Sequence, residues 1–277
     1  MRPPARTILL GACAATALAA LTATAWVAFA PRPVPLAAEA LPLPPQPPRF
    51  AEGPEADRCF ALLRTDPDAA LAFATAWDQQ GGGEGAQHCA ALAVLAAGDV
   101  ARAADQLERL AARSRAGRAV RGAVFAQAAQ AWLMAGEAQR AFAATTLALT
   151  LTPDDVELLI DRAVALGTMG RHGEAVADLD RALASDPQRP DALIFRAAAW
   201  RQLDRAEPAR RDIERALALD PENAEALLER GILRQLAGDT EGARMDWERA
   251  IELAPNSTIA DLAIQNLALS DVGPAAR

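Results

Sequence analysis

Few side chains in this sequence have a type and spacing that could support chemistry. Three cysteines are present, Cys13, Cys59 and Cys89. Cys59 and Cys89 lack the CxxC spacing that activates a thiol, so we expect a disulfide between them in an oxidising compartment. Two buried free thiols are the main alternative, and a redox-active pair is the least favoured. Cys13 lies in an apolar segment and is expected to be inert.

The two histidines and the basic residues predict no active site. His88 adjoins Cys89, but no second cluster of ligands accompanies it, so a metal site is not expected. His172 falls in the Gly170–Gly173 turn, where a side chain facing solvent is expected. All 28 basic residues are arginine, which excludes a lysine-bearing phosphate loop, a Schiff base and a Ser–Lys dyad. We therefore predict no catalytic, cofactor-binding or metal-binding residue and no cofactor. An enzyme with its site outside the repeats is the least favoured reading.

The elements that position these residues follow a 34-residue repeat. The three clear units are Val156–Arg189, Pro190–Asn223 and Ala224–Ser257. The shared residues are Leu159, Leu193 and Leu227 at position 4; Ala163, Ala197 and Gly231 at 8; Ala175, Ala209 and Ala243 at 20; Leu179, Ile213 and Trp247 at 24; and Ala182, Ala216 and Ala250 at 27. Spacings of three and four place each set on one face of a helix, so every unit is expected to be a helix–turn–helix. Gly170 and Gly238 mark the turn in two units, whereas the middle unit has Asp204-Arg205 there.

Two charged columns recur in the same units. Position 7 is always arginine and position 23 is always aspartate, and the residues are Arg162, Arg196 and Arg230 with Asp178, Asp212 and Asp246. Because the columns recur together, we expect each arginine to bind the aspartate across its own hairpin. An anion-binding arginine stripe is the alternative.

This pattern resembles the tetratricopeptide repeat family, with position 11 as its weak point. The family expects an aromatic residue there, but only Trp200 supplies one, while Leu166 and Arg234 depart. The resemblance implies an all-α fold, a right-handed α-solenoid of stacked helix–turn–helix units, and a protein that binds other proteins. Family members that clamp a peptide carboxylate use lysine and asparagine on the concave face, and neither type occurs at the positions expected to line it.

The remaining chain extends the array on both sides. Residues 55–121 are expected to be a degenerate helical-hairpin region; its helices are Ala56–Arg64, Asp68–Gln79, Ala86–Ala97 and Asp99–Ser114. The array itself is expected over 122–257, with a degenerate unit at 122–155 followed by 156–189, 190–223 and 224–257. Residues 258–277 are expected to form a capping helix over Thr258–Ser270 and a tail.

The N-terminal segment predicts export. Residues 1–30 carry Arg2 and Arg6 before an uncharged run, Thr7–Ala30, long enough to cross a bilayer. We favour a single-span membrane anchor, with a cleaved signal peptide as the rival and lipidation at Cys13 less favoured. A Pro-rich linker, 31–54, would hold the folded part away from the membrane. The expected location is the inner membrane with a periplasm-facing domain, or the periplasm or exterior if the signal is cleaved.

The first helices are expected to line a concave groove that binds a protein or peptide partner. The groove residues predicted to contact it are Ile160, Val164, Ile194, Ala198, Arg201, Leu228, Ile232 and Gln235. Coverage of this strip by the chain's own helices is the alternative. The formal net charge of −8 argues against nucleic-acid binding. We thus predict a non-enzymatic scaffold for protein–protein interaction, and the alternative is a structural module that self-associates into a homo-oligomer.

Overall fold

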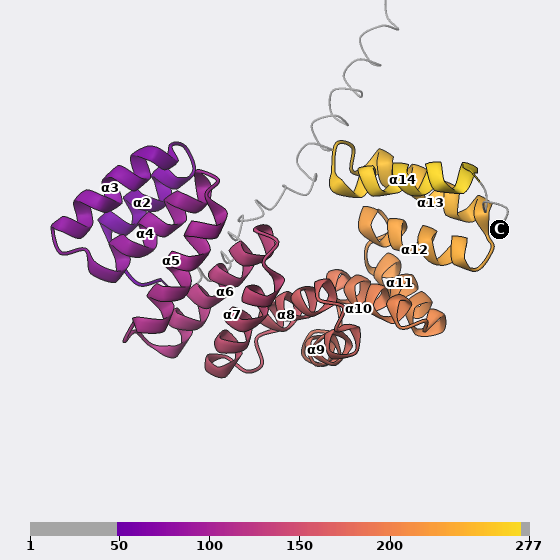
Figure 1. The fold of residues 1–277 in the computed structure, drawn as a ribbon, viewed down its shortest axis with the longest axis horizontal. Coiled ribbons are helices and arrows are strands. Elements are labelled where there is room, and N and C mark those ends of the chain that lie inside the picture. Colours follow the sequence, from indigo (N-terminus) through magenta and orange to yellow (C-terminus); the bar gives the residue numbers. More distant parts are fainter. Residues whose placement is uncertain (1–48, 273–277) are drawn as a thin grey trace, which may run out of the picture. The chain divides into compact units, whose positions relative to one another are not determined.

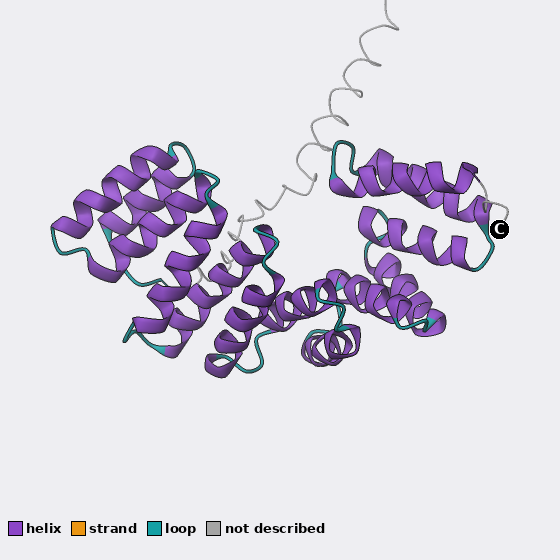
Figure 2. Ribbon diagram, in the orientation of Figure 1, coloured by secondary structure: helices purple, strands orange, loops and turns teal. Residues whose placement is uncertain are grey.

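The computed structural model describes residues 49–272, which form thirteen α-helices and no strand (Figures 1 and 2). The chain divides into two units, Met1–Gln46 and Pro47–Arg277, and the described helices belong to the second. Within residues 49–272, no helix is both long and apolar enough to cross a membrane. The predicted membrane or signal segment, 1–30, and most of the predicted linker, 31–54, lie outside the described residues.

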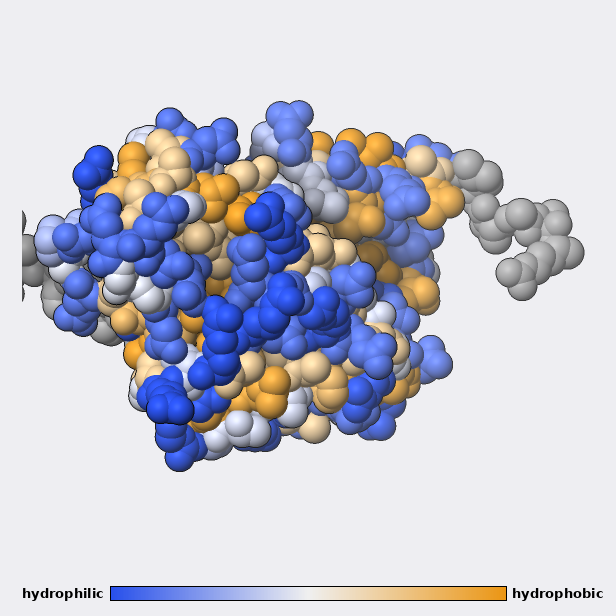
Figure 3. Space-filling model, turned by 60° about the vertical axis from the view of Figure 1, so that its left-hand side comes forward, coloured by the Kyte–Doolittle hydropathy of each residue, from blue (hydrophilic) through white to orange (hydrophobic). Residues whose placement is uncertain are grey.

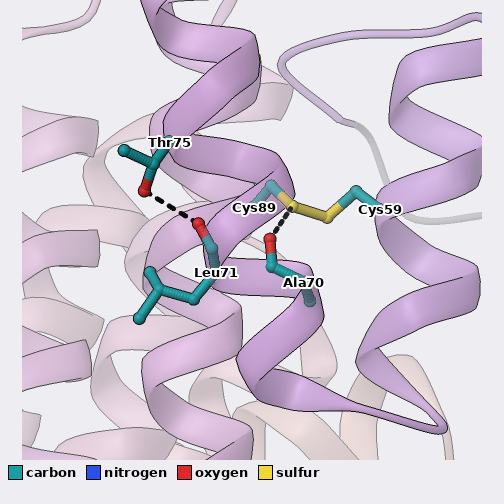
Figure 4. The surroundings of a disulfide bond; sticks show 5 residues. All are labelled: Cys59, Ala70, Leu71, Thr75 and Cys89. Carbon is teal, nitrogen blue, oxygen red and sulfur yellow. Dashed lines mark hydrogen bonds between the residues drawn. A yellow bond between two sulfur atoms is a disulfide. The ribbon is translucent and has the colours of Figure 1, made fainter.

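Helices α2 to α5 precede the clear repeats. They are α2 (Pro54–Leu63), α3 (Pro67–Gln79), α4 (Gly83–Ala96) and α5 (Val100–Arg113). Each begins and ends within three residues of the helix predicted for it. The disulfide Cys59–Cys89 joins α2 to α4, with a Cα–Cα distance of 6.1 Å. Figure 4 shows this bond beside α3, where Cys89 Sγ lies 3.9 Å from the carbonyl oxygen of Ala70.

The helices from residue 118 onward form consecutive hairpins and a final single helix. They are α6 (Arg118–Met134) with α7 (Ala138–Leu151), α8 (Val156–Thr168) with α9 (His172–Ser185), α10 (Pro190–Gln202) with α11 (Ala206–Leu219), α12 (Ala224–Leu236) with α13 (Thr240–Leu253), and α14 (Thr258–Val272). Helices in close contact are first or second neighbours in the chain order, as expected for a stacked array.

Local chemistry explains where the helices begin and turn. Asp155 and Asn223 cap α8 and α12, because their side chains accept from the backbone N–H groups of Leu158 and Ala226. Gly170 and Gly238 take φ values of 74° and 86° in the turns of two hairpins. In the middle hairpin Asp204 itself adopts φ 57°, so a short polar residue replaces glycine there.

The small residues of the repeat lie at the closest helix approaches. Ala163, Ala197 and their partners at position 20 are at most 2% exposed, and so are most of the larger residues at positions 4 and 24. In the last hairpin a Cβ at Gly231 would lie 2.6 Å from Cδ1 of Trp247. The largest side chain at position 24 therefore stands opposite the smallest residue at position 8.

Helix α14 ends the described array. Its own residues Ala260 and Ala263 are buried, whereas Asp261, Leu262, Ile264 and Leu269 are exposed. The exposed surface of α14 is therefore only partly polar. On the face shown in Figure 3, hydrophilic residues predominate and apolar residues form smaller patches between them.

Candidate functional site

The arginine and aspartate columns form three equivalent bidentate ion pairs. Arg162 donates to Asp178 at 2.6 and 2.7 Å, Arg196 to Asp212 at 2.7 and 2.8 Å, and Arg230 to Asp246 at 2.6 and 2.8 Å. These hydrogen bonds are the main cause of the raised pKa of each arginine. The aspartates are 4–7% exposed. The prediction of a structural bridge across each hairpin is confirmed, so these arginines are not a free anion-binding stripe.

A second column of arginines, at position 26 of the repeat, was not predicted from the sequence. Arg181 donates to the carbonyl oxygen of Pro153 at 2.9 Å, and Arg215 donates to that of Pro187 at 2.6 Å. In the last unit Arg249 instead donates to Glu222, next to the equivalent Pro221, at 2.8 Å. These contacts fasten each second helix to the preceding inter-repeat turn. The sequence does contain this column, because arginine occupies position 26 of all three units.

The predicted groove residues differ in how deeply they are buried. Ile160, Ile194 and Leu228, all at position 5, are 4%, 3% and 7% exposed and belong to the continuous hydrophobic core. The expectation that they line an open groove is corrected, because the chain's own helices cover them within the core. This coverage was the alternative weighed from the sequence. At position 9, Val164, Ala198 and Ile232 are only partly buried.

Position 12 is different in each unit. Arg201 on α10 donates to Glu229 on α12 at 2.6 and 3.2 Å, and Glu229 is 6% exposed. This ion pair joins two first helices. Arg201, one of the predicted contact residues, therefore already has a partner within the chain. Gln235 is partly buried, and its Oε1 is a buried atom without a hydrogen-bond partner. In the first unit position 12 is Gly167, which has no side chain to cover its neighbours.

A hollow of about 210 Å³ lies beside Gly167. Val164 and Gly167 of α8, Phe195 and Ala198 of α10, and His172 of α9 contribute to its lining. Two of the predicted groove residues, Val164 and Ala198, thus meet at an accessible depression between first helices. His172 is the first residue of α9 and is partly exposed where it borders this hollow.

Carboxylates on the first helices give this surface an acidic side. The pKa of Asp161 on α8 is raised to about 6, chiefly because the side chain is buried. The hydrogen bond from Gln130 lowers this pKa, and the nearby charges of Glu157 and Asp155 raise it. Burial likewise raises the pKa of Glu225 on α12, helped by Asp191 and Glu229. A basic ligand group near Asp161 would favour its ionised form and so be stabilised in return.

The remaining chemistry-bearing side chains serve the core. His88 is 3% exposed, its Nε2 lies 2.6 Å from Oε1 of Gln127, and Phe50 and Phe60 contact its ring edge-on. Burial is the main cause of its lowered pKa. Among residues 49–272, no group of three or more His, Cys, Asp or Glu side chains is placed to hold a metal ion.

Comparison with known proteins identifies the class. The tetratricopeptide repeat profile matches residues 129–199 and 195–268, together more than half of the chain. The chain belongs to the tetratricopeptide repeat family, whose members generally mediate protein–protein interactions through non-enzymatic scaffolds. No curated protein matches the sequence significantly.

Solved structures agree with this fold. The pilF protein of Pseudomonas aeruginosa is 16% identical, with a TM-score of 0.60, over 78% of this chain and 95% of that one. YrrB, described as a tetratricopeptide repeat protein with an unusual peptide-binding site, is 18% identical, with a TM-score of 0.54, over 62% and 88%. A Parabacteroides merdae repeat protein is 21% identical, with a TM-score of 0.53, over 66% and 73%. At these identities the similarity shows the fold alone.

Proposed function

We propose that this protein is an exported scaffold that binds a partner polypeptide on its first-helix surface, at the hollow between α8 and α10. The observation that carries the proposal is the hollow itself. Gly167 leaves it open, and Val164, Phe195 and Ala198 give it apolar walls. Between α10 and α12, position 12 instead carries Arg201, which is paired with Glu229. Apolar depressions with a few polar groups are the usual sites of peptide anchoring.

A photo-crosslinking residue at Ala198 in living cells tests this surface. We expect an adduct with another protein, lost when Val164→Glu places a charge in the hollow. The matched control is the same crosslinker at Ala218, an exposed alanine on the second helix α11. Equal adducts from the two positions, or an adduct insensitive to Val164→Glu, would contradict the proposal.

Export is supported by the uncharged segment Thr7–Ala30 behind two arginines and by the Cys59–Cys89 disulfide. We propose a membrane anchor and a periplasmic folded part. Protease added to spheroplasts should digest residues 49–272 without lysis, and the mass of the mature chain should retain residues 1–30. Protection from the protease would rule out export, whereas a shortened chain would establish the cleaved signal peptide.

Self-association is the second candidate function, and α14 is the observation that favours it. Leu262, Ile264 and Leu269 are 44%, 52% and 67% exposed on the last described helix. Leu262 and Leu269, seven residues apart, share one helix face, and stacking that face on a second copy would cover both. Sedimentation of the protein with Leu269→Glu separates the candidates, because a dimer lost in this variant favours self-association and a monomer in both forms excludes it.

A further inference from the structure

The first-helix surface around the α8–α10 hollow has an acidic half and an uncharged half. Residues at positions 2, 6, 9 and 13 of a unit share one face of its first helix, because they are three or four residues apart. In the three clear units positions 9 and 13 carry no charge and are Val164, Ala198 and Ile232, then Thr168, Gln202 and Leu236. Positions 2 and 6 are acidic except for Phe195, and the acids are Glu157, Asp161, Asp191, Glu225 and Glu229. The hollow lies in the uncharged half.

Three of these five carboxylates are neutralised within the chain. Arg189, the N-cap residue of α10, donates to Asp191 at 2.6 and 3.0 Å and also to Glu157. Glu229 is paired with an arginine of α10. Acids at position 2 stand in the first turn of a helix, where the helix dipole also stabilises them. Asp161 stands in the second turn of α8 and has neither kind of support.

Asp161 lacks a cation. Its hydrogen-bond donor is Gln130 on α6, at 3.2 Å, and among residues 49–272 no arginine forms an ion pair with it. The charges that act on it belong to Glu157 and Asp155 and are both negative. Val164, in the wall of the hollow, follows it by three residues on the same helix, so the carboxylate stands one turn away from that wall. A bound ammonium or guanidinium group would offset the cost of ionising this carboxylate there.

Glu225 repeats this situation on the other side of the hollow. It is partly buried on α12, and within the described part of the chain it has no ion-pair partner. The charges acting on it are those of Asp191 and Glu229, again both negative. Successive first helices contact one another in the order α6, α8, α10 and α12, so Asp161 and Glu225 flank the α8–α10 hollow. Five carboxylates and two guanidiniums leave this surface with a formal charge of −3.

We infer that the partner segment bound at the α8–α10 hollow is basic, with an apolar side chain in the hollow and a neighbouring lysine or arginine paired with Asp161. A second basic residue further along the segment would pair with Glu225. The hollow lies roughly 5–9 Å from Asp161 along α8, so the basic residue belongs within about three residues of the apolar one in an extended segment. An acidic segment would meet like charges and no unpaired arginine in the lining of the hollow. This inference rests on the proposed function, because it names the chemistry of the partner at that surface.

Selection of phage-displayed random dodecapeptides on the purified full chain tests the inference. We expect the selected peptides to share an apolar residue with lysine or arginine close by, and to contain fewer acids than the unselected library. A parallel selection on the Val164→Glu variant should not enrich them, because the substitution places a charge in the hollow.

Fluorescence anisotropy of one selected peptide then measures the contribution of Asp161. Asp161→Asn should weaken binding by about 3- to 10-fold, the effect of one partly buried ion pair. Replacing the peptide's basic residue by norleucine should weaken binding to the wild type by a similar factor and change binding to Asp161→Asn little further. The matched control is Asp180→Asn, which removes the same charge from a 55% exposed carboxylate on α9 of the same hairpin. It should change the affinity by less than about twofold.

The outcomes separate this inference from the proposed function. Peptides that need Val164 but no basic residue, or equal weakening by Asp161→Asn and Asp180→Asn, would overturn the inference and leave the proposed surface in place. Peptides insensitive to Val164→Glu, or a selection that enriches none, would reject the α8–α10 surface and the inference together.

Discussion

At the residue scale, the buried ion pairs on the repeats hold helices together. Asp212 is 7% exposed and accepts two hydrogen bonds from Arg196, whose side chain is 18% exposed. A carboxylate this deep is stabilising only while its cation remains in place. The same helix surfaces carry pairs such as Arg196–Asp180, whose aspartate is 55% exposed and contributes much less.

The first prediction separates these two kinds of pair. Asp212→Ala should lower the free energy of unfolding by about 2–3 kcal/mol, because Arg196 keeps a poorly hydrated charge with only Asp180 beside it. Asp180→Ala should lower it by less than about 1 kcal/mol. Urea denaturation followed by circular dichroism measures both. Equal losses would mean that burial does not distinguish the pairs. The double variant Arg196→Met with Asp212→Leu should recover most of the stability lost in Asp212→Ala.

A second prediction concerns the pH dependence that Asp161 creates. Its pKa in the folded protein is raised to about 6, so the folded state holds this proton more tightly than the unfolded chain does. The contribution of Asp161 to stability therefore grows as pH falls through about 6 toward 4, and is unfavourable at pH 7. Asp161→Asn should raise the free energy of unfolding by about 1–3 kcal/mol at pH 7.

The gain from Asp161→Asn should disappear near pH 4, where the native carboxyl is already neutral. Unfolding curves of the two proteins at pH 7 and pH 4.5 measure the difference. Asp180→Asn, at an exposed position, is the control and should show little pH-dependent gain. A gain from Asp161→Asn that persists unchanged at low pH would mean that the amide stabilises by packing instead.

At the element scale, the distance between the two helices of a hairpin is set by paired choices at positions 8 and 24. The first two units combine alanine with leucine or isoleucine, whereas the last combines Gly231 with Trp247. The indole is 1% exposed, and its Nε1 donates to the carbonyl oxygen of Leu228 at 3.2 Å. No room remains for another carbon on α12 at this point.

Gly231→Ala is therefore expected to destabilise the protein by about 1–3 kcal/mol through overpacking, although alanine is the better helix former. Gly167→Ala is the matched control in α8, where a Cβ would meet open space, and should stabilise by about 0.4–1 kcal/mol. Thermal and urea unfolding measure both. Combining Gly231→Ala with Trp247→Leu should cost less than the sum of the single changes, and simple additivity would refute the proposed pairing.

At the scale of the whole molecule, stability is distributed along a line, since helices contact only near neighbours in the chain order. The helix furthest toward the start of the described array, α2, has few buried residues of its own, Ala56 and Cys59. The disulfide to Cys89 on α4 is thus a large part of what fixes it. The resemblance to the family did not indicate this disulfide, which lies outside the residues that the family profile matches.

Reduction of the disulfide, or Cys59→Ser with Cys89→Ser, should lower the free energy of unfolding by roughly 3–4 kcal/mol on the chain-entropy model. Because coupling along the array is local, the loss should be concentrated at α2 and α3. Hydrogen exchange should show faster exchange over residues 54–79 and little change in α8 to α13. A uniform increase throughout the array would contradict a locally acting disulfide.

The sequence by itself determined the helical hairpins, their bounds to within a few residues and the three buried ion pairs. These follow from short-range rules, since helix faces, caps and a 34-residue spacing are all visible along one chain.

Only the tertiary structure decided which first-helix residues remain accessible. Ile160, Ile194 and Leu228 share the helix face of Val164 and Ala198, yet they are buried in the core. Burial between repeats depends on the side chains of both neighbours. The hollow at Gly167 and the ion pair between Arg201 and Glu229 arise from such pairings. A repeat pattern that describes one unit at a time does not contain them, because each is a property of two units in contact.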